Sequence, residues 1–327
     1  MVMTWADYDR PELHGGYAGK HGGSPEFVFV ESEDEALKKL AAGLRPDVMH
    51  PCAYDLRRWR EAGLLRPLDE RLLPNLADVW DRLKAIPQTV YRGQRWFAPF
   101  DCGHASVLYR TDLVDPADVE EESWALLFDD AYAGRLAMYD AGPELVATAA
   151  LALGYGAGAS LDDDQLDRVR LLLSRQRVLL RFYWREAEEM EHALASGEIV
   201  ASYAWNDSAL RVAAMGVPVR FMEPREGRLA WVCGLVRHAA APGDEVAAHD
   251  FINAMLAPEA GQFLIETYSV GHANRKAFAR VDPELLAELG WADAAASFRH
   301  CMVLEEPEEP LRSRYLDLVA RMKAGLD

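Results

Sequence analysis

The sequence predicts an α/β fold built as two lobes around largely parallel sheets. At 327 residues the chain exceeds the roughly 250 to 300 residues over which one hydrophobic core grows. Strand-like and helix-like runs alternate along it, as in parallel sheets. Aromatic and polar residues also gather where predicted strands give way to helices, at residues 51–54, 100–104, 139–144 and 205–208. Because ligands bind at the carboxyl ends of such strands, we expect these segments to form one binding site.

The first elements follow from apolar spacing and from glycines that end helices. Residues 33–43 place leucines at helical spacing and end at Gly43, which predicts a helix with a glycine cap. Residues 45–51 are typical of a short buried strand. Residues 53–65 predict a second helix with Gly63 near its end.

The same alternation continues through the middle of the chain. Strands are predicted at residues 134–140, 199–205, 217–224 and 228–236. Helices are predicted at residues 142–156, 190–198 and 206–216. The helix at 206–216 begins with Asn206, Asp207 and Ser208, three residue types that cap helix starts. The last third of the chain is predicted to be mostly helical.

Composition and motifs exclude several function classes. The 53 acidic residues outnumber 35 basic ones, for a net charge of −18, so we expect no nucleic-acid partner. The sequence has no GxGxxG, no GxxxxGK[ST], no HExxH and no GxSxG motif. We therefore expect no catalytic residues, no cofactor and no metal ligands. No apolar run reaches the length of a membrane span.

Four segments carry a resemblance to a known family: TWADY at residues 4–8, AYAGRLAMYD at 131–140, ASYAWNDSA at 201–209 and PREGRLAWVCGLV at 224–236. In this order the chain resembles the periplasmic polyamine-binding (spermidine/putrescine) proteins of ABC importers, which are extracellular solute-binding proteins, over essentially its whole length. The combined order of the shared positions is what makes the resemblance specific: Trp5, Tyr54, Gly134, Trp205, Trp231 and Asn274.

The resemblance implies a type II periplasmic-binding-protein fold, in which a hinge joins two α/β lobes that trap a ligand. The N-terminal lobe is then expected to comprise residues 1–104 and 232–277, and the C-terminal lobe residues 105–231 and 278–327. A periplasmic location is implied as well. Because Met1 stands three residues before TWADY, we expect the signal peptide to have been removed.

By the same resemblance, an aromatic box with carboxylates lines the ligand site. The residues carried over are Trp5, Asp7, Tyr8, Cys52, Tyr54, Glu144, Trp205, Trp231 and Cys233, with Asp101, Trp184, Asp207, Val270, His272 and Glu305 as further candidates. An indole face attracts a cation or packs on an alkyl chain, and a carboxylate accepts hydrogen bonds from an ammonium group.

The chain departs from the family pattern where charge matters most. Two positions that hold carboxylates in polyamine binders are Ala141 and Cys233, and an aromatic position is replaced around Val270. An ammonium group buried without a carboxylate costs several kcal/mol. We therefore expect a smaller ligand, either with one cationic nitrogen and an apolar body, or a zwitterion whose counter-charge is Arg275 or His272.

The cysteines leave three readings open. Cys52, Cys102 and Cys233 fall in segments that the resemblance places beside the ligand, near His50, His104 and His272. They are small apolar pocket residues, or Cys52 and Cys233 form a disulfide across neighbouring strands, or a soft metal is bound by Cys and His.

The expected function is that of a monomeric, non-catalytic receptor that delivers a small solute to the transmembrane permease subunits of an ABC importer. The alternative is a protein of the same fold that uses Cys/His metal binding, or an enzyme in which a Cys233 thiolate acts with His272 as base. A third possibility is a cytoplasmic relative that only sequesters its ligand.

Overall fold

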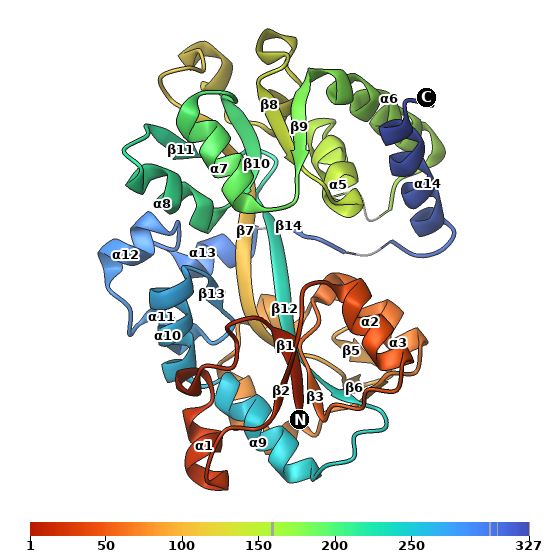
Figure 1. Cartoon of the computed structure of the whole chain (residues 1–327), viewed down its shortest axis with the longest axis vertical. Helices are drawn as coiled ribbons and strands as arrows, with labels where there is room; N and C mark the ends of the chain where they lie inside the picture. The colour runs from red at the N-terminus through yellow and green to blue at the C-terminus, as the bar shows by residue number, and fades with distance from the viewer. Residues whose placement is uncertain (158–159, 301, 306, 327) are drawn as a thin grey trace. The chain divides into compact units, whose positions relative to one another are not determined.

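The computed structural model describes residues 1–157, 160–300, 302–305 and 307–326, and these form two compact units. Unit 1 comprises Met1–Gly103 and Trp231–Arg299, and unit 2 comprises His104–Ala230 and His300–Asp327. The chain therefore passes between the units three times. The first two passages lie within the long strands β7 (Ala98–Arg110) and β12 (Leu229–His238), which are visible in Figure 1.

Unit 1 is built on a mixed sheet in which β1 lies between two parallel neighbours. Its remaining strands are β1 (Val2–Trp5), β2 (Phe27–Val30), β3 (Val48–Met49), β4 (Leu65–Arg66), β5 (Val90–Tyr91), β6 (Gln94–Arg95) and β13 (Gly271–His272). β1 pairs in parallel with β2 and β3, and β12 runs antiparallel to β3 and β4. The register of β1 on β3 pairs Met3 with Met49. The carboxyl ends of these two strands therefore meet at one edge.

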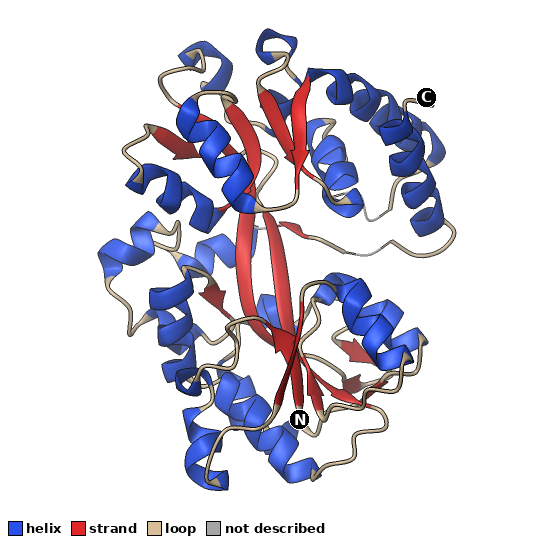
Figure 2. Cartoon of the chain, in the orientation of Figure 1, coloured by secondary structure: helices blue, strands red, loops and turns tan. Residues whose placement is uncertain are grey.

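Helices flank the strands of unit 1 (Figure 2). The α-helices are α1 (Gly15–His21), α2 (Glu33–Ala41), α3 (Leu56–Glu61), α4 (Asp81–Lys84), α9 (Glu245–Met255), α10 (Pro258–Tyr268), α11 (Arg275–Phe278), α12 (Pro283–Glu288) and α13 (Ala294–His300). The shorter 3-10 helices are η1 (Pro11–Leu13), η2 (Ala53–Asp55), η3 (Glu70–Leu72) and η4 (Pro74–Asp78). α2 begins where the Ser32 hydroxyl accepts the Glu35 N–H, and α1 packs on α9.

The third passage lies later in the chain than the sequence predicted. We expected it after residue 277, but unit 1 continues to Arg299. The reason is an aromatic cluster that ties α12 and α13 to this unit. Trp291 and Phe298 lie with ring centroids 5.1 Å apart, and Phe298 packs on Trp80 at 5.3 Å. Burial of these rings holds the chain in unit 1 beyond residue 277, where the resemblance implied the boundary.

Unit 2 contains a mixed sheet. Its strands besides β7 are β8 (Leu136–Tyr139), β9 (Leu180–Trp184), β10 (Ala201–Trp205), β11 (Val219–Phe221) and β14 (Met302–Val303). β8 pairs in parallel with β9 and β10, and β7 runs antiparallel to β10 and β11. β8, β9 and β10 thus deliver their carboxyl ends to the same edge.

The helices of unit 2 form two groups around this sheet, as Figure 1 shows. They are α5 (Gly142–Ala152), α6 (Asp163–Leu179), α7 (Ala187–Ser196), α8 (Asn206–Ala214) and α14 (Leu311–Ala324), with 3-10 helices η5 (Pro116–Val119), η6 (Trp124–Phe128) and η7 (Asp130–Tyr132). α5, α6 and α14 pack on one another, and α7 packs on α8. A capping box of Asp162 and Gln165 starts α6.

Several predicted elements are shorter in the structure. The strand predicted at 45–51 has ladder pairing only at β3, because Pro46 and Pro51 lack the N–H that a ladder requires. The helix predicted at 53–65 divides into η2 and α3, and the helix predicted at 142–156 ends with α5.

None of the helices in the described ranges has both the length and the apolar character of a membrane span.

Candidate ligand-binding site

In unit 1, strand register brings Trp5 and both pocket cysteines to one edge of the sheet. Trp5 is the last residue of β1, and β1 is parallel to β3. Just beyond β3, Cys52 pairs with Cys233 of β12 in an isolated antiparallel bridge. Trp5 and Cys52 are half-buried, whereas Cys233 is buried. The edge therefore presents an indole beside a sulfur-containing wall.

Cys52 and Cys233 form a disulfide, which decides among the three readings of the cysteines. Cys102 is buried and takes no part in a disulfide, and Cys301 lies outside the described residues. Within the described ranges, no three His, Cys, Asp or Glu side chains form a group that would hold a metal ion. The disulfide reading thus fits, and the soft-metal reading gains no support.

Trp231 packs against a position that only glycine can occupy. A Cβ added at Gly103 would lie 2.4 to 2.6 Å from three atoms of the Trp231 indole, closer than any real contact. The backbone of Gly103 does not require a left-handed conformation, so the close approach alone explains the glycine. Gly103 thereby fixes the plane of a predicted ligand wall.

Tyr8 ends a buried hydrogen-bond network. Its hydroxyl donates to Oδ2 of Asp101 at 2.6 Å, and Oδ1 of Asp101 lies 2.9 Å from Nε2 of His50. Nδ1 of His50 lies 3.0 Å from the Thr4 hydroxyl. Burial, followed by the charge of Asp101, raises the pKa of Tyr8 well above 10. Both oxygens of Asp101 are engaged, so Asp101 positions Tyr8 rather than meeting a ligand, contrary to our expectation.

Asp7 stands in a turn that exposes its carboxylate. Its backbone is left-handed, with φ of 68°, a conformation that Asp and Asn tolerate better than most residues. Its carbonyl accepts a hydrogen bond from the Tyr268 hydroxyl at 2.7 Å. Tyr268 also packs on Tyr8, with ring centroids 5.9 Å apart. Tyr268 thus supplies an aromatic side chain two residues before the half-buried Val270, where the sequence suggested that one was lost.

His272 is not available for a ligand, for a metal or for catalysis. It is fully buried, its Nδ1 accepts the Asn274 N–H at 3.0 Å, and its Nε2 lies 3.0 Å from the Met255 carbonyl. Burial lowers its pKa to about 4, so it is neutral at pH 7. With Cys233 in a disulfide, the predicted Cys233–His272 thiol chemistry is wrong.

In unit 2, the ends of β8, β9 and β10 bring four aromatic rings together. Tyr139 lies 4.7 Å from Trp184 and 5.1 Å from Trp205 between ring centroids, and the two indoles are perpendicular at 5.2 Å. Tyr203 stacks on Tyr139 at 6.0 Å. Trp184 is fully buried and donates its Nε1–H to the Ser202 hydroxyl, so it forms the back of this group. Trp205 is half-buried and is the more accessible indole.

Glu144 is the carboxylate that accompanies these rings. It is half-buried in the first turn of α5, where the helix dipole stabilises negative charge. Burial and then the charge of Glu144 raise the pKa of Tyr139 to about 12 and that of Tyr203 well above 10. The carboxylate therefore lies close enough to the phenols to favour their neutral, hydrogen-bonding form.

Two other charged candidates are already paired. Asp207 accepts a hydrogen bond from Arg211 at 2.7 Å, and the same guanidinium holds the buried Glu191. Asp207 is therefore engaged within the chain, and its role as a ligand carboxylate stays a prediction. Arg275 lies 3.6 Å from Asp78 and is not a free counter-charge for a zwitterion. Glu305 is half-buried beyond β14, and its role stays a prediction.

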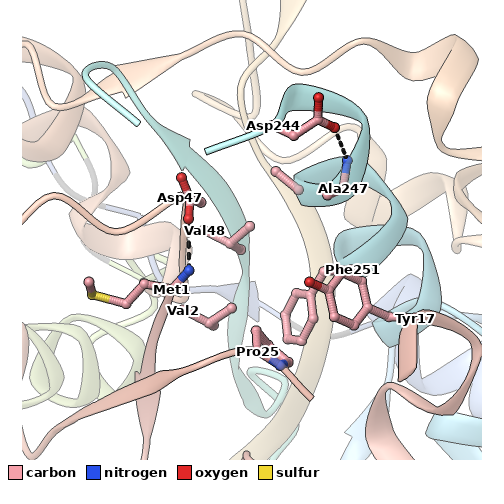
Figure 3. A pocket seen from close by; sticks show the side chains of 10 residues that line it. Met1, Val2, Tyr17, Pro25, Asp47, Val48, Asp244, Ala247 and Phe251 are labelled. Atoms are coloured by element: carbon pink, nitrogen blue, oxygen red, sulfur yellow. Dashed lines mark hydrogen bonds and ion pairs between the residues drawn. The ribbon is translucent and has the colours of Figure 1, made fainter. Parts of the chain in front are cut away.

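A separate cavity of about 170 Å3 lies at the amino ends of β1 and β3 (Figure 3). Its lining is Met1, Val2, Tyr17, Pro25, Asp47, Val48, Asp244, Ala247, Ala248 and Phe251. Its two carboxylates are satisfied within the chain, because Asp47 accepts from the Met1 amine and Gly243 N–H, and Asp244 caps α9. None of the predicted ligand residues reaches it.

Known proteins with a similar sequence or a similar fold include binding proteins of transport systems. The spermidine/putrescine-binding periplasmic protein of Escherichia coli is 24% identical over 284 residues, which are 86% of this chain and 79% of that protein. The spermidine/putrescine ABC transporter substrate-binding protein PotD of Streptococcus pneumoniae has the same fold, with a TM-score of 0.83 at 20% identity over 100% of this chain and 98% of that one. MotA of A. tumefaciens, solved with glucopine, reaches a TM-score of 0.72 at 15% identity, over 100% and 99%.

These similarities establish a mixed α/β periplasmic-binding-protein fold and a class of proteins that bind solutes rather than catalyse reactions. The family model described as bacterial extracellular solute-binding protein matches residues 20–293, most of the sequence. The chain therefore belongs to the bacterial extracellular solute-binding protein family.

Proposed function

We propose that this protein is the periplasmic substrate-binding component of an ABC importer and that it captures a small solute with one cationic nitrogen and an apolar body. The carrying observation is that each unit brings aromatic rings and one carboxylate to the carboxyl ends of its parallel strands. In unit 1 these are Trp5, Trp231 and Asp7, and in unit 2 Trp205 and Glu144. A relative named for polyamines and a neighbour solved with glucopine show that proteins of this type bind different ligands, so the fold alone does not determine the ligand of this chain.

The carboxylates near the aromatic residues of the two units favour a ligand with one cationic centre over a ligand with two. Ala141 and the disulfide at Cys233 stand where the resemblance implies carboxylates, and Asp101 and Asp207 are engaged within the chain. Of the two carboxylates that remain, Glu144 is half-buried and Asp7 is exposed, so a second ammonium buried with the ligand would gain little from its partner. A zwitterion lacks a counter-charge, because His272 is neutral and Arg275 is paired. Choline-like and other quaternary monocations fit best, with contacts of about 0.5 to 2 kcal/mol per indole.

The test is a titration of the wild type and three tryptophan variants with choline, betaine, putrescine and spermidine. Trp231→Ala and Trp205→Ala should each weaken choline binding at least about tenfold, equal to 1.4 kcal/mol. Trp96→Ala is the matched control, because Trp96 is half-buried and its Nε1–H donates to Tyr91, away from the strand ends. Unchanged affinity in Trp231→Ala would overturn the aromatic site, and tight spermidine binding would overturn the single charge.

Delivery to transmembrane permease subunits is the part of this role that solution binding does not probe. The cognate permease reconstituted in liposomes should hydrolyse ATP faster when the choline-loaded protein is added than when the unloaded protein is added. Equal rates with both forms would contradict a role in import.

A further inference from the structure

A carboxylic acid from α2 holds the segment that carries Cys52 and Tyr54. Oε1 of Glu33 accepts the Cys52 N–H at 2.7 Å, at the residue that starts η2. The cysteine side chain provides no cap of its own for this 3-10 helix. Glu33 therefore fixes the backbone from which the disulfide and Tyr54 extend. No sequence motif pointed to this residue.

The surroundings of Glu33 favour its neutral form. Burial, and then the charge of Asp55, raise its pKa from 4.5 to about 8, although its position at the start of a helix favours a carboxylate. Its Oε2 is buried, and hydrogen bonding from the Cys52 N–H and the Trp59 indole lowers the pKa by less than burial raises it. At pH 7 Glu33 is mostly a carboxylic acid.

The other charges near Glu33 largely cancel one another. Asp34 and Glu35 belong to the same helix, where Glu35 pairs with Lys39. Arg58 of α3 pairs with Asp34 at 2.9 Å and lies 3.8 Å from Asp55. With its guanidinium shared in this way, Arg58 does not offset the burial of a second carboxylate.

We propose that Glu33, as a neutral acid, is a positioning residue that holds the Cys52–Tyr54 wall in its ligand-binding form, and that this wall is released when Glu33 ionises. A carboxylate accepts the Cys52 N–H more strongly than a neutral acid does, but that bond does not offset the cost of burying the charge beside Asp55. The ionised side chain would therefore turn toward water and free the Cys52 N–H from its acceptor. The inference deepens the proposed function and rests on it for the ligand, but the state of the Cys52 amide can be followed without any ligand.

The first measurement follows the backbone amide of Cys52 by NMR in protein labelled with 15N-cysteine, between pH 6 and 9.5. In the wild type this resonance should titrate with a midpoint near the pKa of about 8. In Glu33→Gln it should not titrate, because the amide oxygen accepts the same hydrogen bond and carries no ionisable proton. A flat response in the wild type, or the same titration in Glu33→Gln, would overturn the proposal.

The second measurement uses choline as the probe, because its charge is constant over this pH range. If only the neutral form binds, the affinity of the wild type should fall about tenfold between pH 7 and 9, as the neutral fraction drops from about 0.9 to about 0.1. Glu33→Gln should bind as the wild type does at pH 7 and keep that affinity at pH 9. Glu33→Ala should bind weakly at both pH values.

The two measurements separate the two ideas. If choline does not bind the wild type at any pH but the Cys52 amide titrates, the proposed ligand class fails and the role of Glu33 in the wall stands. If choline binds with equal affinity at pH 7 and 9, the role of Glu33 fails and the proposed function stands.

Discussion

At the scale of single residues, two features of unit 1 set the geometry of its ligand wall. Gly103 leaves room for the Trp231 indole, and the left-handed turn at Asp7 projects a carboxylate outward. Neither feature is itself a strong contact. Each fixes where a group able to bind a cation stands, and orientation of this kind decides affinity as much as the number of contacts does.

Replacing Gly103 with alanine should displace the Trp231 ring. The new methyl group would lie 2.4 Å from the indole, and the ring must move by about an ångström to restore normal contact. We expect choline affinity to fall at least about tenfold in isothermal titration. Gly19→Ala is the control, because nothing lies within 4 Å of its added Cβ. Wild-type affinity in Gly103→Ala would show that this wall does not contact the ligand.

Asp7→Asn should remove charge without changing the backbone, since asparagine also adopts the left-handed conformation at φ of 68°. A quaternary nitrogen has no N–H to donate, so the exposed Asp7 attracts such a cation by charge alone, which contributes about 0.2 to 1 kcal/mol. Choline-like cations should therefore bind roughly 1.5- to 5-fold more weakly. Binding should be followed by intrinsic tryptophan fluorescence, with Asp9→Asn as the neighbouring charge control. An equal loss in both variants would point to a general field effect instead of a specific carboxylate.

The positions of residues at strand ends could be predicted from the sequence. Contacts between residues that are far apart in the chain could not. Trp205 ends a strand, as the alternation suggested, and Trp5 ends β1. Tyr139 stood in a segment already marked by its aromatic and acidic residues, yet only the geometry joined it to Trp205. Tyr268 ends α10 and meets Asp7, 261 residues earlier, a contact that no local pattern encodes.

At the scale of elements, the disulfide ties the end of β3 to β12. It joins residues 181 positions apart, and the chain between them includes the first stretch of unit 2. The cross-link therefore excludes many extended conformations of the unfolded chain. Sequence reasoning kept this pairing open because it depends on register between strands far apart in the chain, whereas α2 was predicted locally from the spacing of its leucines and from Gly43.

Removing the disulfide should destabilise the protein by about 5 kcal/mol, the loop-closure value for a loop of this length. The variant Cys52→Ser/Cys233→Ser should show this loss in urea unfolding followed by far-UV circular dichroism. The wild type treated with dithiothreitol should show a similar loss, as the reagent is oxidised and the disulfide becomes two thiols. A stable wild type under dithiothreitol, with the disulfide shown by thiol assay to be reduced, would contradict this contribution.

At the scale of the whole molecule, the fold class was predictable because alternating strands and helices admit few arrangements. The boundary between the units at residue 299 could not be predicted. It depends on contacts among Trp80, Trp291 and Phe298, which are separated by about 200 residues of sequence. The dependence of stability on pH is also a property of the whole molecule. Buried groups in both units titrate differently in the folded and unfolded chain, so their effects combine in one stability curve.

Stability should be greatest near pH 6.5. Burial lowers the pKa of His104 to about 3 and that of His272 to about 4. The unfolded chain therefore takes up protons first as the pH falls below about 6.5, and the free energy of unfolding decreases there.

The pKa shift of Glu33 has the opposite effect on the pH dependence of stability. Its pKa of about 8 lies above the unfolded value, so the stability it confers is complete below pH 4.5 and is lost as pH rises to about 8. Below pH 6.5 these two histidines outweigh Glu33. Above pH 6.5 Glu33 is the one of these three groups that still lowers the stability, by up to about 1.4 kcal/mol for each pH unit. Melting temperatures measured from pH 4 to 9 by calorimetry should therefore form a dome, and Glu33→Gln should flatten its alkaline side and steepen its acid side, where Glu33 no longer opposes the histidines. An alkaline decline of equal slope in Glu33→Gln would assign the loss to another group.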